Sequence, residues 1–164
     1  MEKADLKVFR DLKQLSQAAA SLIISLANQA ITERGRFSVA LSGGSTPRQL
    51  YQMLTGAQYQ GKTDWSRWHF FFSDERLVSL DHKFSNYGMA YKALLSSPEI
   101  REDQIHPAQV GGGTPSELAS SYEADIRYFF RAAEKEIPRF DLILLGMGSD
   151  GHTASLFPGK AALS

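Results

Sequence analysis

Asp150 and His152 are the residues in this sequence best suited to do chemistry. They stand beside each other in a glycine-rich loop that follows the apolar run of residues 142–145. A histidine titrates near neutral pH, and a nearby carboxylate can orient its ring, so the pair suits general acid–base catalysis. An isolated histidine is more often structural, but at the end of a strand and between glycines we interpret His152 as catalytic.

The glycines of this loop allow a second interpretation. Residues 146–151 match Gly-x-Gly-x-x-Gly, the pattern of a dinucleotide-binding turn. That turn also needs a following helix and strand, with an acid about 20 residues further on. Here Pro158 and Gly159 interrupt, and the sequence ends at Ser164. We therefore treat the match as accidental.

A second candidate loop reads Ser-Gly-Gly-Ser-Thr-Pro at residues 42–47 and lies between a predicted strand and a predicted helix. Glycines let a backbone approach a ligand closely, and the amides at a helix N-terminus favour an anion. The alternative is an ordinary tight turn; a Walker A loop is excluded because its Gly-Lys-Ser/Thr end is missing. The candidate phosphate-binding residues are Ser42, Gly43, Gly44, Ser45, Thr46 and Arg48.

A third loop reads Ser-Asp-Glu-Arg at residues 73–76, directly after an apolar strand. Arg76 could bind a phosphate or carboxylate, and Asp74 could orient a base or a sugar hydroxyl. The alternative is a surface ion pair, which would contribute little. Of the other histidines, His69 is predicted to be structural, and neither His82 nor His106 has a supporting cluster. No metal-ligand spacing occurs, so we expect no metal.

The elements that must position these loops alternate between helix and strand. Apolar residues recur at helical spacing after Asp11, an N-cap, and the buried face should carry Leu15, Ala19, Leu22, Ile23, Leu26 and Ala30. The expected elements are a helix from Asp11 to Arg34 closed by Gly35, a strand at 37–41, a helix with Thr46 as N-cap, a strand at 68–72, a helix from Ser85 or Asn86 to Leu95, an extended piece at 105–110, a helix from the capping box at 114–117 to about Glu136, and a strand at 141–145.

This alternation predicts an α/β fold: a three-layer α/β/α, doubly wound, mainly parallel sheet of Rossmann-like type. The chain should form a single domain over residues 1–164, with residues 142–145 buried on both faces. Because parallel strands end at one edge of the sheet, the three loops should form one site.

Composition excludes several classes of protein. The 18 basic and 18 acidic residues balance, which argues against nucleic acid or an anionic membrane as a partner. Without cysteine there can be no disulfide, thiolate metal site or cysteine nucleophile. Polar residues interrupt the longest apolar helix, and the N-terminal residues lack an export pattern, so we expect a cytoplasmic protein. Its oligomeric state is left open.

The three loops, in this order, resemble the 6-phosphogluconolactonase family over essentially the whole chain. The resemblance is carried by residues 42–47, by residues 73–76 with Ser85 and Asn86, and by Gly-Met-Gly-Ser-Asp-Gly-His-Thr-Ala-Ser-Leu-Phe-Pro at residues 146–158. The related glucosamine-6-phosphate deaminases share Asp-Gly-His but typically continue towards Asn-Glu-Pro. Ser-Leu-Phe-Pro at residues 155–158 therefore indicates the lactonase branch.

The resemblance implies a cofactor-independent hydrolase that opens 6-phospho-D-glucono-1,5-lactone in the oxidative pentose phosphate pathway. Residues 43–46 would bind the 6-phosphate, and His152 would activate water and then protonate the leaving ring oxygen. Arg76 would bind phosphate or stabilise developing charge, while Asp74 and Asp150 would orient His152 or sugar hydroxyls. Family members usually continue for several dozen residues past Ser-Leu-Phe-Pro, so we expect the chain to be either a fragment or a version with a shortened sheet. A missing strand would leave an apolar sheet edge open and favour association.

Two other functions stay possible. One is a sugar-phosphate isomerase or deaminase of the same broad fold, with Asp74 as the proton-abstracting base. The other is a non-catalytic module that binds a sugar phosphate, for which His152 would be dispensable. Release of ammonia would identify the first, and binding without turnover the second.

Overall fold

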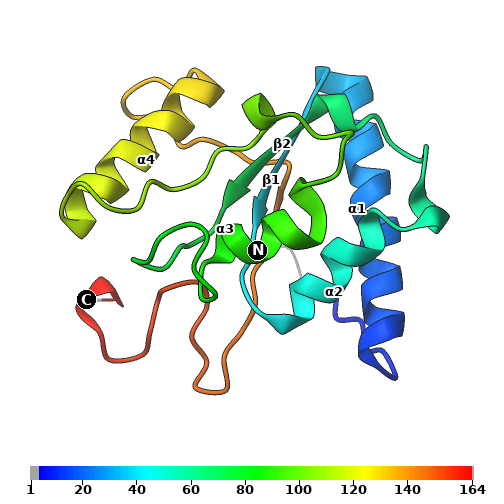
Figure 1. Cartoon of the computed structure of the whole chain (residues 1–164), viewed down its shortest axis with the longest axis horizontal. Helices are drawn as coiled ribbons and strands as arrows, with labels where there is room; N and C mark the ends of the chain where they lie inside the picture. The colour runs from blue at the N-terminus through cyan, green and yellow to red at the C-terminus, as the bar shows by residue number, and fades with distance from the viewer. Residues whose placement is uncertain (1–3, 164) are drawn as a thin grey trace.

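Three parallel strands form the centre of the molecule. The computed structural model describes residues 4–163, so residues 1–3 and 164 of the predicted domain lie outside it. The strands are β1 (Phe37–Leu41), β2 (Trp68–Phe72) and β3 (Leu142–Ile143), in the order β2-β1-β3 (Figure 1). Phe37 pairs with Trp68, and Val39 pairs with Leu142. All three strands therefore end at the same edge of the sheet.

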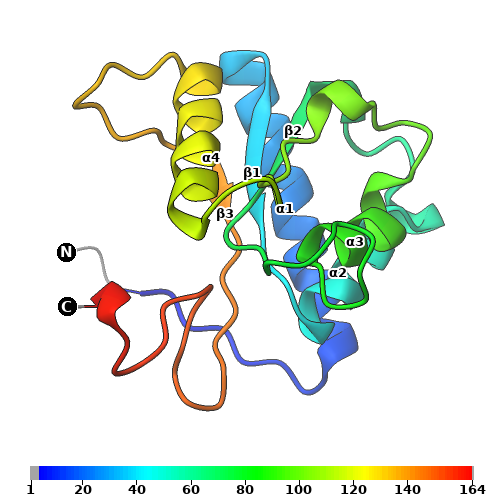
Figure 2. The same cartoon turned by 60° about the vertical axis from the view of Figure 1, so that its left-hand side comes forward.

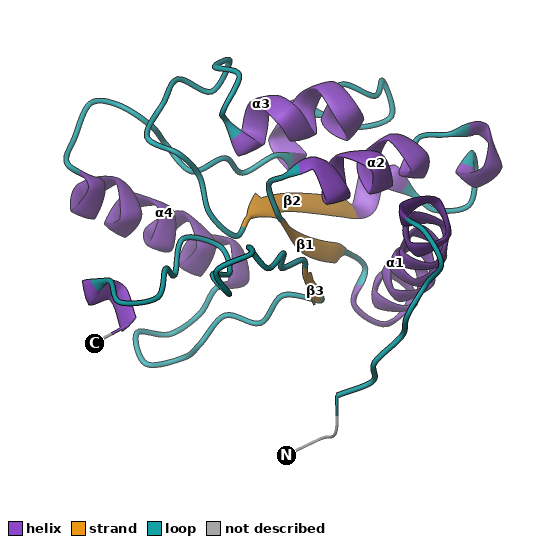
Figure 3. Cartoon of the chain, turned by 90° about the horizontal axis from the view of Figure 1, so that it is seen from below, coloured by secondary structure: helices purple, strands orange, loops and turns teal. Residues whose placement is uncertain are grey.

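Helices cover both faces of this sheet. In the described part they are α1 (Leu12–Arg34), α2 (Ser45–Leu54), α3 (Asn86–Ala90, extended by a π-helical turn at Tyr91–Leu95) and α4 (Pro115–Phe130). Figure 3 shows α1, α2 and α3 on one side of the strands and α4 on the other. Short 3₁₀ turns lie at Ala57–Tyr59, Trp65–Arg67, Glu102–Gln104 and Ala161–Leu163. The predicted α/β architecture, with a parallel sheet between helices, is confirmed.

Alternate residues of β1 and β2 face opposite layers, as the period of a strand requires. Val39 and Phe70 belong to a buried core with Ile23 of α1 and Tyr51 of α2. On the other face, Phe71 contacts Phe129 of α4, with ring centroids 5.0 Å apart. The larger core therefore lies under α1, α2 and α3.

The ends of α1 and the start of α4 agree with the sequence. Asp11 accepts a hydrogen bond from the amide of Gln14, and Gly35 closes α1 at φ 75°. Thr114 and Glu117 form the predicted capping box at the start of α4. These signals are local, so the sequence alone suffices to place them.

Two helix boundaries differ from prediction. α2 begins at Ser45, with Gly44 as an N-cap that offers no side chain, so Thr46 is not the cap. α4 ends at Phe130 rather than near Glu136, because Arg131 turns the chain into the left-handed region at φ 52°. The Arg127 guanidinium binds the carbonyls of the turn that follows, at Ala133 and Glu136.

Several predicted burials are wrong. β3 covers two residues instead of 141–145, and Ile143 and Leu145 are 50% and 59% exposed. In the described part of the chain β3 pairs only with β1, so it is an edge strand rather than one buried on both faces. Leu15 and Leu22 of α1 are also exposed. The extended piece at 105–110 contributes an isolated bridge between Ile105 and Phe70.

Candidate active site

The loops that follow β1, β2 and β3 line one pocket of about 470 Å³. In both Figure 1 and Figure 2 the loops leave the strands towards the lower part of the molecule. The volume lies in the range of small-molecule sites, about 300–1,000 Å³. The lining residues are Leu15, residues 42–47, Leu50, Asp74, Arg76, residues 144–148, His152 and Ala154.

The first loop presents the start of α2 to the pocket. Ser42 is fixed at its backbone: its amide donates to the Tyr51 hydroxyl at 2.9 Å, and that hydroxyl donates to its carbonyl at 2.8 Å. Burial raises the pKa of the Tyr51 hydroxyl, which therefore stays protonated and able to donate. Gly44, the N-cap of α2, has no side chain that could accept a hydrogen bond from the first backbone amides of the helix. These N–H groups are therefore available to bind an anion.

The second loop is anchored to α3 by Glu75. Its carboxylate accepts hydrogen bonds from the amides of Asn86 and Tyr87, both at 2.7 Å, and from the Ser85 hydroxyl at 3.0 Å. Glu75 therefore caps the first turn of a short helix and fixes the position of its chain neighbours, Asp74 and Arg76.

Asn86 links the two predicted site residues of this loop. Its amide nitrogen donates to the carbonyl oxygen of Asp74 at 2.9 Å and to Asp74 Oδ1 at 3.2 Å. Its amide oxygen accepts a hydrogen bond from Arg76 Nη1. Spacing along the chain could not reveal these contacts, although Asn86 was part of the recognised motif.

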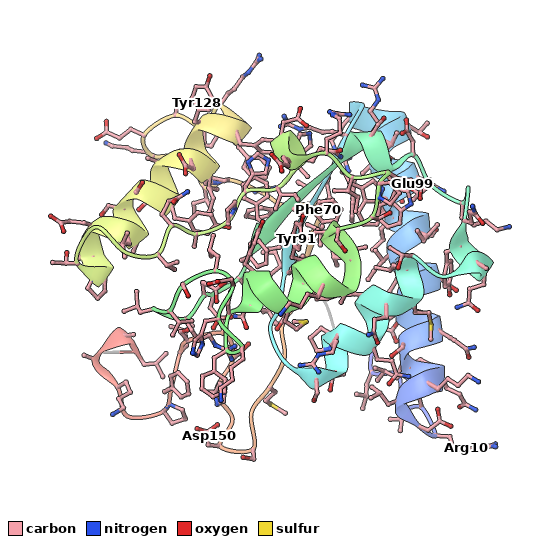
Figure 4. All side chains as sticks on the ribbon, viewed as in Figure 1. Arg10, Phe70, Tyr91, Glu99, Tyr128 and Asp150 are labelled. Carbon is pink, nitrogen blue, oxygen red and sulfur yellow. The ribbon has the colours of Figure 1, made fainter. Side chains whose placement is uncertain are left out.

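The third loop places His152 against the pocket with Asp150 behind it. Asp150 Oδ1 lies 2.5 Å from His152 Nδ1 and also accepts the His152 amide at 3.2 Å. The His152 ring stacks on Phe157 with centroids 4.4 Å apart. Asp150 does not line the pocket; it lies at the tip of its loop (Figure 4). The imidazole is therefore oriented from one edge, and its Nε2 is the nitrogen left for a ligand.

Two glycines of this loop, Gly148 and Gly151, make room for the His152 ring and for the turn that carries it. A Cβ atom on Gly148 would lie 2.2 Å from two atoms of the His152 ring, so only glycine fits there without movement. Gly151 turns the chain at φ 84°, and its amide donates to the Gly148 carbonyl at 3.0 Å. This geometry gives the Gly-x-Gly-x-x-Gly spacing a physical reason other than a dinucleotide.

The second and third loops are tied together by Ser155. Its hydroxyl donates to Asp74 Oδ2 at 2.9 Å. With Asn86 on Oδ1, both oxygens of the Asp74 carboxylate accept hydrogen bonds. The sequence analysis did not name Ser155 as a site residue. Its position in the recognised motif, three residues after His152, could have identified it.

Besides Asp150, other residues considered from the sequence lie outside the pocket, among them Arg48, His69 and His106. Arg48 is exposed on α2 and is not part of the lining, so its role in phosphate binding stays a prediction. His69 packs between β2 and α4, with its Nδ1 3.2 Å from His106 Nε2. Among residues 4–163 no three His, Cys, Asp or Glu side chains are placed to bind a metal ion.

Comparison with known proteins decides the family. Residues 10–164 match the family described as glucosamine-6-phosphate isomerases/6-phosphogluconolactonase. The chain belongs to this family. The match covers all three pocket loops, so the geometry above is that of a glucosamine-6-phosphate isomerase/6-phosphogluconolactonase family member.

Relatives within the family carry lactonase names. A 6-phosphogluconolactonase from Synechocystis is 43% identical over 92% of this chain and 61% of its own length. One from Nostoc is 41% identical over 98% of this chain and 65% of its own length. The chain thus spans less than two thirds of these curated relatives.

Solved structures agree in fold. The 6-phosphogluconolactonase from Trypanosoma cruzi superposes with a TM-score of 0.86 at 37% identity, covering 99% of this chain and 65% of that one. The Trypanosoma brucei enzyme gives 0.85 at 32% identity, covering 98% and 65%. Within the described residues, no helix of this family member is both long and apolar enough to cross a bilayer.

Proposed function

We propose that the protein hydrolyses 6-phospho-D-glucono-1,5-lactone to 6-phospho-D-gluconate without a cofactor. One observation carries the proposal: a histidine oriented by a carboxylate lines the same pocket as the uncapped start of α2 and Arg76. The pocket thus combines a base with a place for a phosphate. The names of the relatives support the same reaction.

The geometry suggests a role for each residue. His152 Nε2 takes a proton from water, and the resulting hydroxide adds to C1 of the lactone. The bond between C1 and the ring oxygen then breaks, and the imidazolium returns the proton to that oxygen; the new carboxyl group loses its proton to solvent. Asp150 keeps Nδ1 protonated throughout, which leaves Nε2 free to act as the base.

The phosphate binds at the start of α2. The amides of Ser45 and Thr46 and the dipole of α2 favour a dianion there, and Gly43 and Gly44 let it approach the backbone. Arg76 adds a positive charge from the second loop.

A phosphorylated sugar does not diffuse through a bilayer, so we place the enzyme in the cytoplasm with its substrate; cell fractionation tests this.

The isomerase or deaminase alternative is weaker on one specific observation. Asn86 and Ser155 each donate a hydrogen bond to one oxygen of Asp74, so the carboxylate that would have to abstract the proton is restrained by two other elements instead of being free to turn towards a substrate carbon. Assays on the chain should therefore show lactone opening faster than spontaneous hydrolysis, and no ammonia from glucosamine 6-phosphate. Ammonia release would reverse this assignment.

The His152→Ala variant tests catalysis directly. We expect kcat for the lactone to fall by about 10²–10⁴, the usual contribution of a general acid–base. Affinity for 6-phosphogluconate, measured by calorimetry, should persist because the start of α2 is unchanged. The His82→Ala variant, in a loop outside the pocket, is the matched control. Near-normal turnover in His152→Ala would remove His152 as the proposed base. Binding of 6-phosphogluconate by the unchanged chain without any turnover would instead favour a binding module.

A further inference from the structure

Asp74 and Arg76 point into one pocket with opposite charges, yet they do not pair. In the described part of the chain no ion pair joins them, although one residue separates them in sequence. The Asn86 side chain lies between them, donating to Asp74 and accepting from Arg76 Nη1. A neutral amide thus occupies the position where a direct ion pair would form.

Asn86 is held too firmly to turn away. It is 1% exposed, it begins α3, and its own amide donates to Glu75 at 2.7 Å. A Cβ atom on Gly43 would lie 1.8 Å from Asn86 Oδ1, so the first loop packs directly on this side chain. Its partners also fix which end is which, because Arg76 can only donate and the Asp74 oxygens can only accept.

The bridge has an electrostatic consequence. Arg76 uses Nη1 for Asn86 and for the Phe84 carbonyl, so within residues 4–163 its Nε and Nη2 make no hydrogen bond. If the carboxylate of Asp74 reached the guanidinium, a bidentate pair would occupy those donors and cancel the charge that an anionic substrate needs.

We propose that Asn86 is a positioning residue that keeps Asp74 and Arg76 apart, so that Arg76 stays free to bind the anionic substrate. This rests on the proposed function, since it concerns the same pocket. Asn86 does not touch the reacting atoms; it acts through Arg76.

The test measures binding of 6-phosphogluconate to the whole chain by calorimetry. Asn86→Ala should weaken binding by about tenfold, because Asp74 can then pair with Arg76. Asn86→Asp, which keeps the shape and so the packing, should weaken it at least as much, since its own carboxylate captures the guanidinium. Thr114→Ala is the control: it removes the side-chain cap of α4, outside the pocket, so it should lower Tm while leaving affinity within about twofold.

A second substitution separates positioning from simple damage. In Asp74→Asn/Asn86→Ala the competing carboxylate is gone, so affinity should recover most of what Asn86→Ala lost. Equal affinities for Asn86→Ala and Thr114→Ala, or no recovery in the double variant, would overturn the proposal while the lactonase function stands. If the unchanged chain neither binds 6-phosphogluconate nor opens the lactone, the proposed function fails and this inference fails with it.

Discussion

At the scale of single residues, the contact between Asp150 and His152 sets the protonation of the proposed base. The hydrogen bond from the His152 side chain, followed by that from its amide, lowers the pKa of the Asp150 carboxyl below its usual value. A carboxyl with a lowered pKa stays ionised above its ordinary pKa and loses its charge only as the pH falls through the lowered value. At neutral pH Asp150 is therefore an anion that keeps the proton on Nδ1.

The Asp150→Asn variant should no longer hold the ring proton of His152 on Nδ1. The amide can donate to Nδ1, which would place the ring proton on Nε2 and block its action as a base. We expect kcat to fall by about 10²–10⁴, with little change in the affinity for 6-phosphogluconate. Stopped-flow lactone hydrolysis above the spontaneous background measures this. Asp81→Asn, in a loop outside the pocket, is the control; equal rates for the two variants would contradict the role of Asp150.

At the scale of elements, α4 is attached to the sheet through an aromatic and histidine cluster. His69 of β2 contacts Phe129 at 4.7 Å between ring centroids, and His106 stacks on Phe71 at 4.3 Å. Burial, with smaller effects from His106 and Arg36, lowers the pKa of His69 to about 4. Burial also lowers the pKa of His106. Both histidines are therefore neutral in the folded protein near neutral pH.

This cluster predicts a pH-dependent stability. Between the ordinary pKa of 6.5 and about 4, the unfolded chain binds a proton at His69 and the folded chain does not. The free energy of unfolding should therefore fall as the pH is lowered through this window, and His69 should add no further loss below it. His69→Gln should make the dependence shallower, as measured by urea unfolding at several pH values, with part of it left because of His106.

His82→Gln serves as the control for this experiment, because His82 lies in a loop away from α4. It should leave the slope of stability against pH unchanged. An unaltered slope in His69→Gln would show that α4 is not held in the way described.

At the scale of the whole molecule, the β3 edge is the most exposed apolar part of the sheet. Ile143 is 50% exposed and Leu145 is 59% exposed. Within the described residues β3 pairs on one side only. Unpaired strand edges with apolar side chains promote pairing with another chain. Within residues 4–163 this edge of β3 is unpaired, and association through it stays a prediction.

We expect the chain to self-associate as its concentration rises. Ile143→Lys should weaken this association by about tenfold or more, because a charge would have to be buried against the added strand. Light scattering on a sizing column measures it. Leu22→Lys, which changes an equally exposed leucine on α1, should have no such effect. Equal association of both variants and the unchanged chain would exclude the β3 edge.

Local signals determined much of this protein. The caps at Asp11 and Thr114, the strands β1 and β2, and the meeting of three loops at one sheet edge all follow from short-range spacing and from the shared direction of parallel strands. His152 and Asp150 were recognisable for the same reason, since only Gly151 separates them in the chain.

Only the tertiary structure decided the rest. Asn86 bonds to Asp74 from 12 residues away in the chain, and Ser155 bonds to Asp74 from 81 residues away. Asn86 also packs against Gly43 of the first loop. No local sequence pattern predicts these contacts. The exposure of Ile143 likewise depends on which strands lie beside β3, not on its own apolar sequence. Spacing within the chain set each element and its loop, whereas packing between distant elements set which side chains touch.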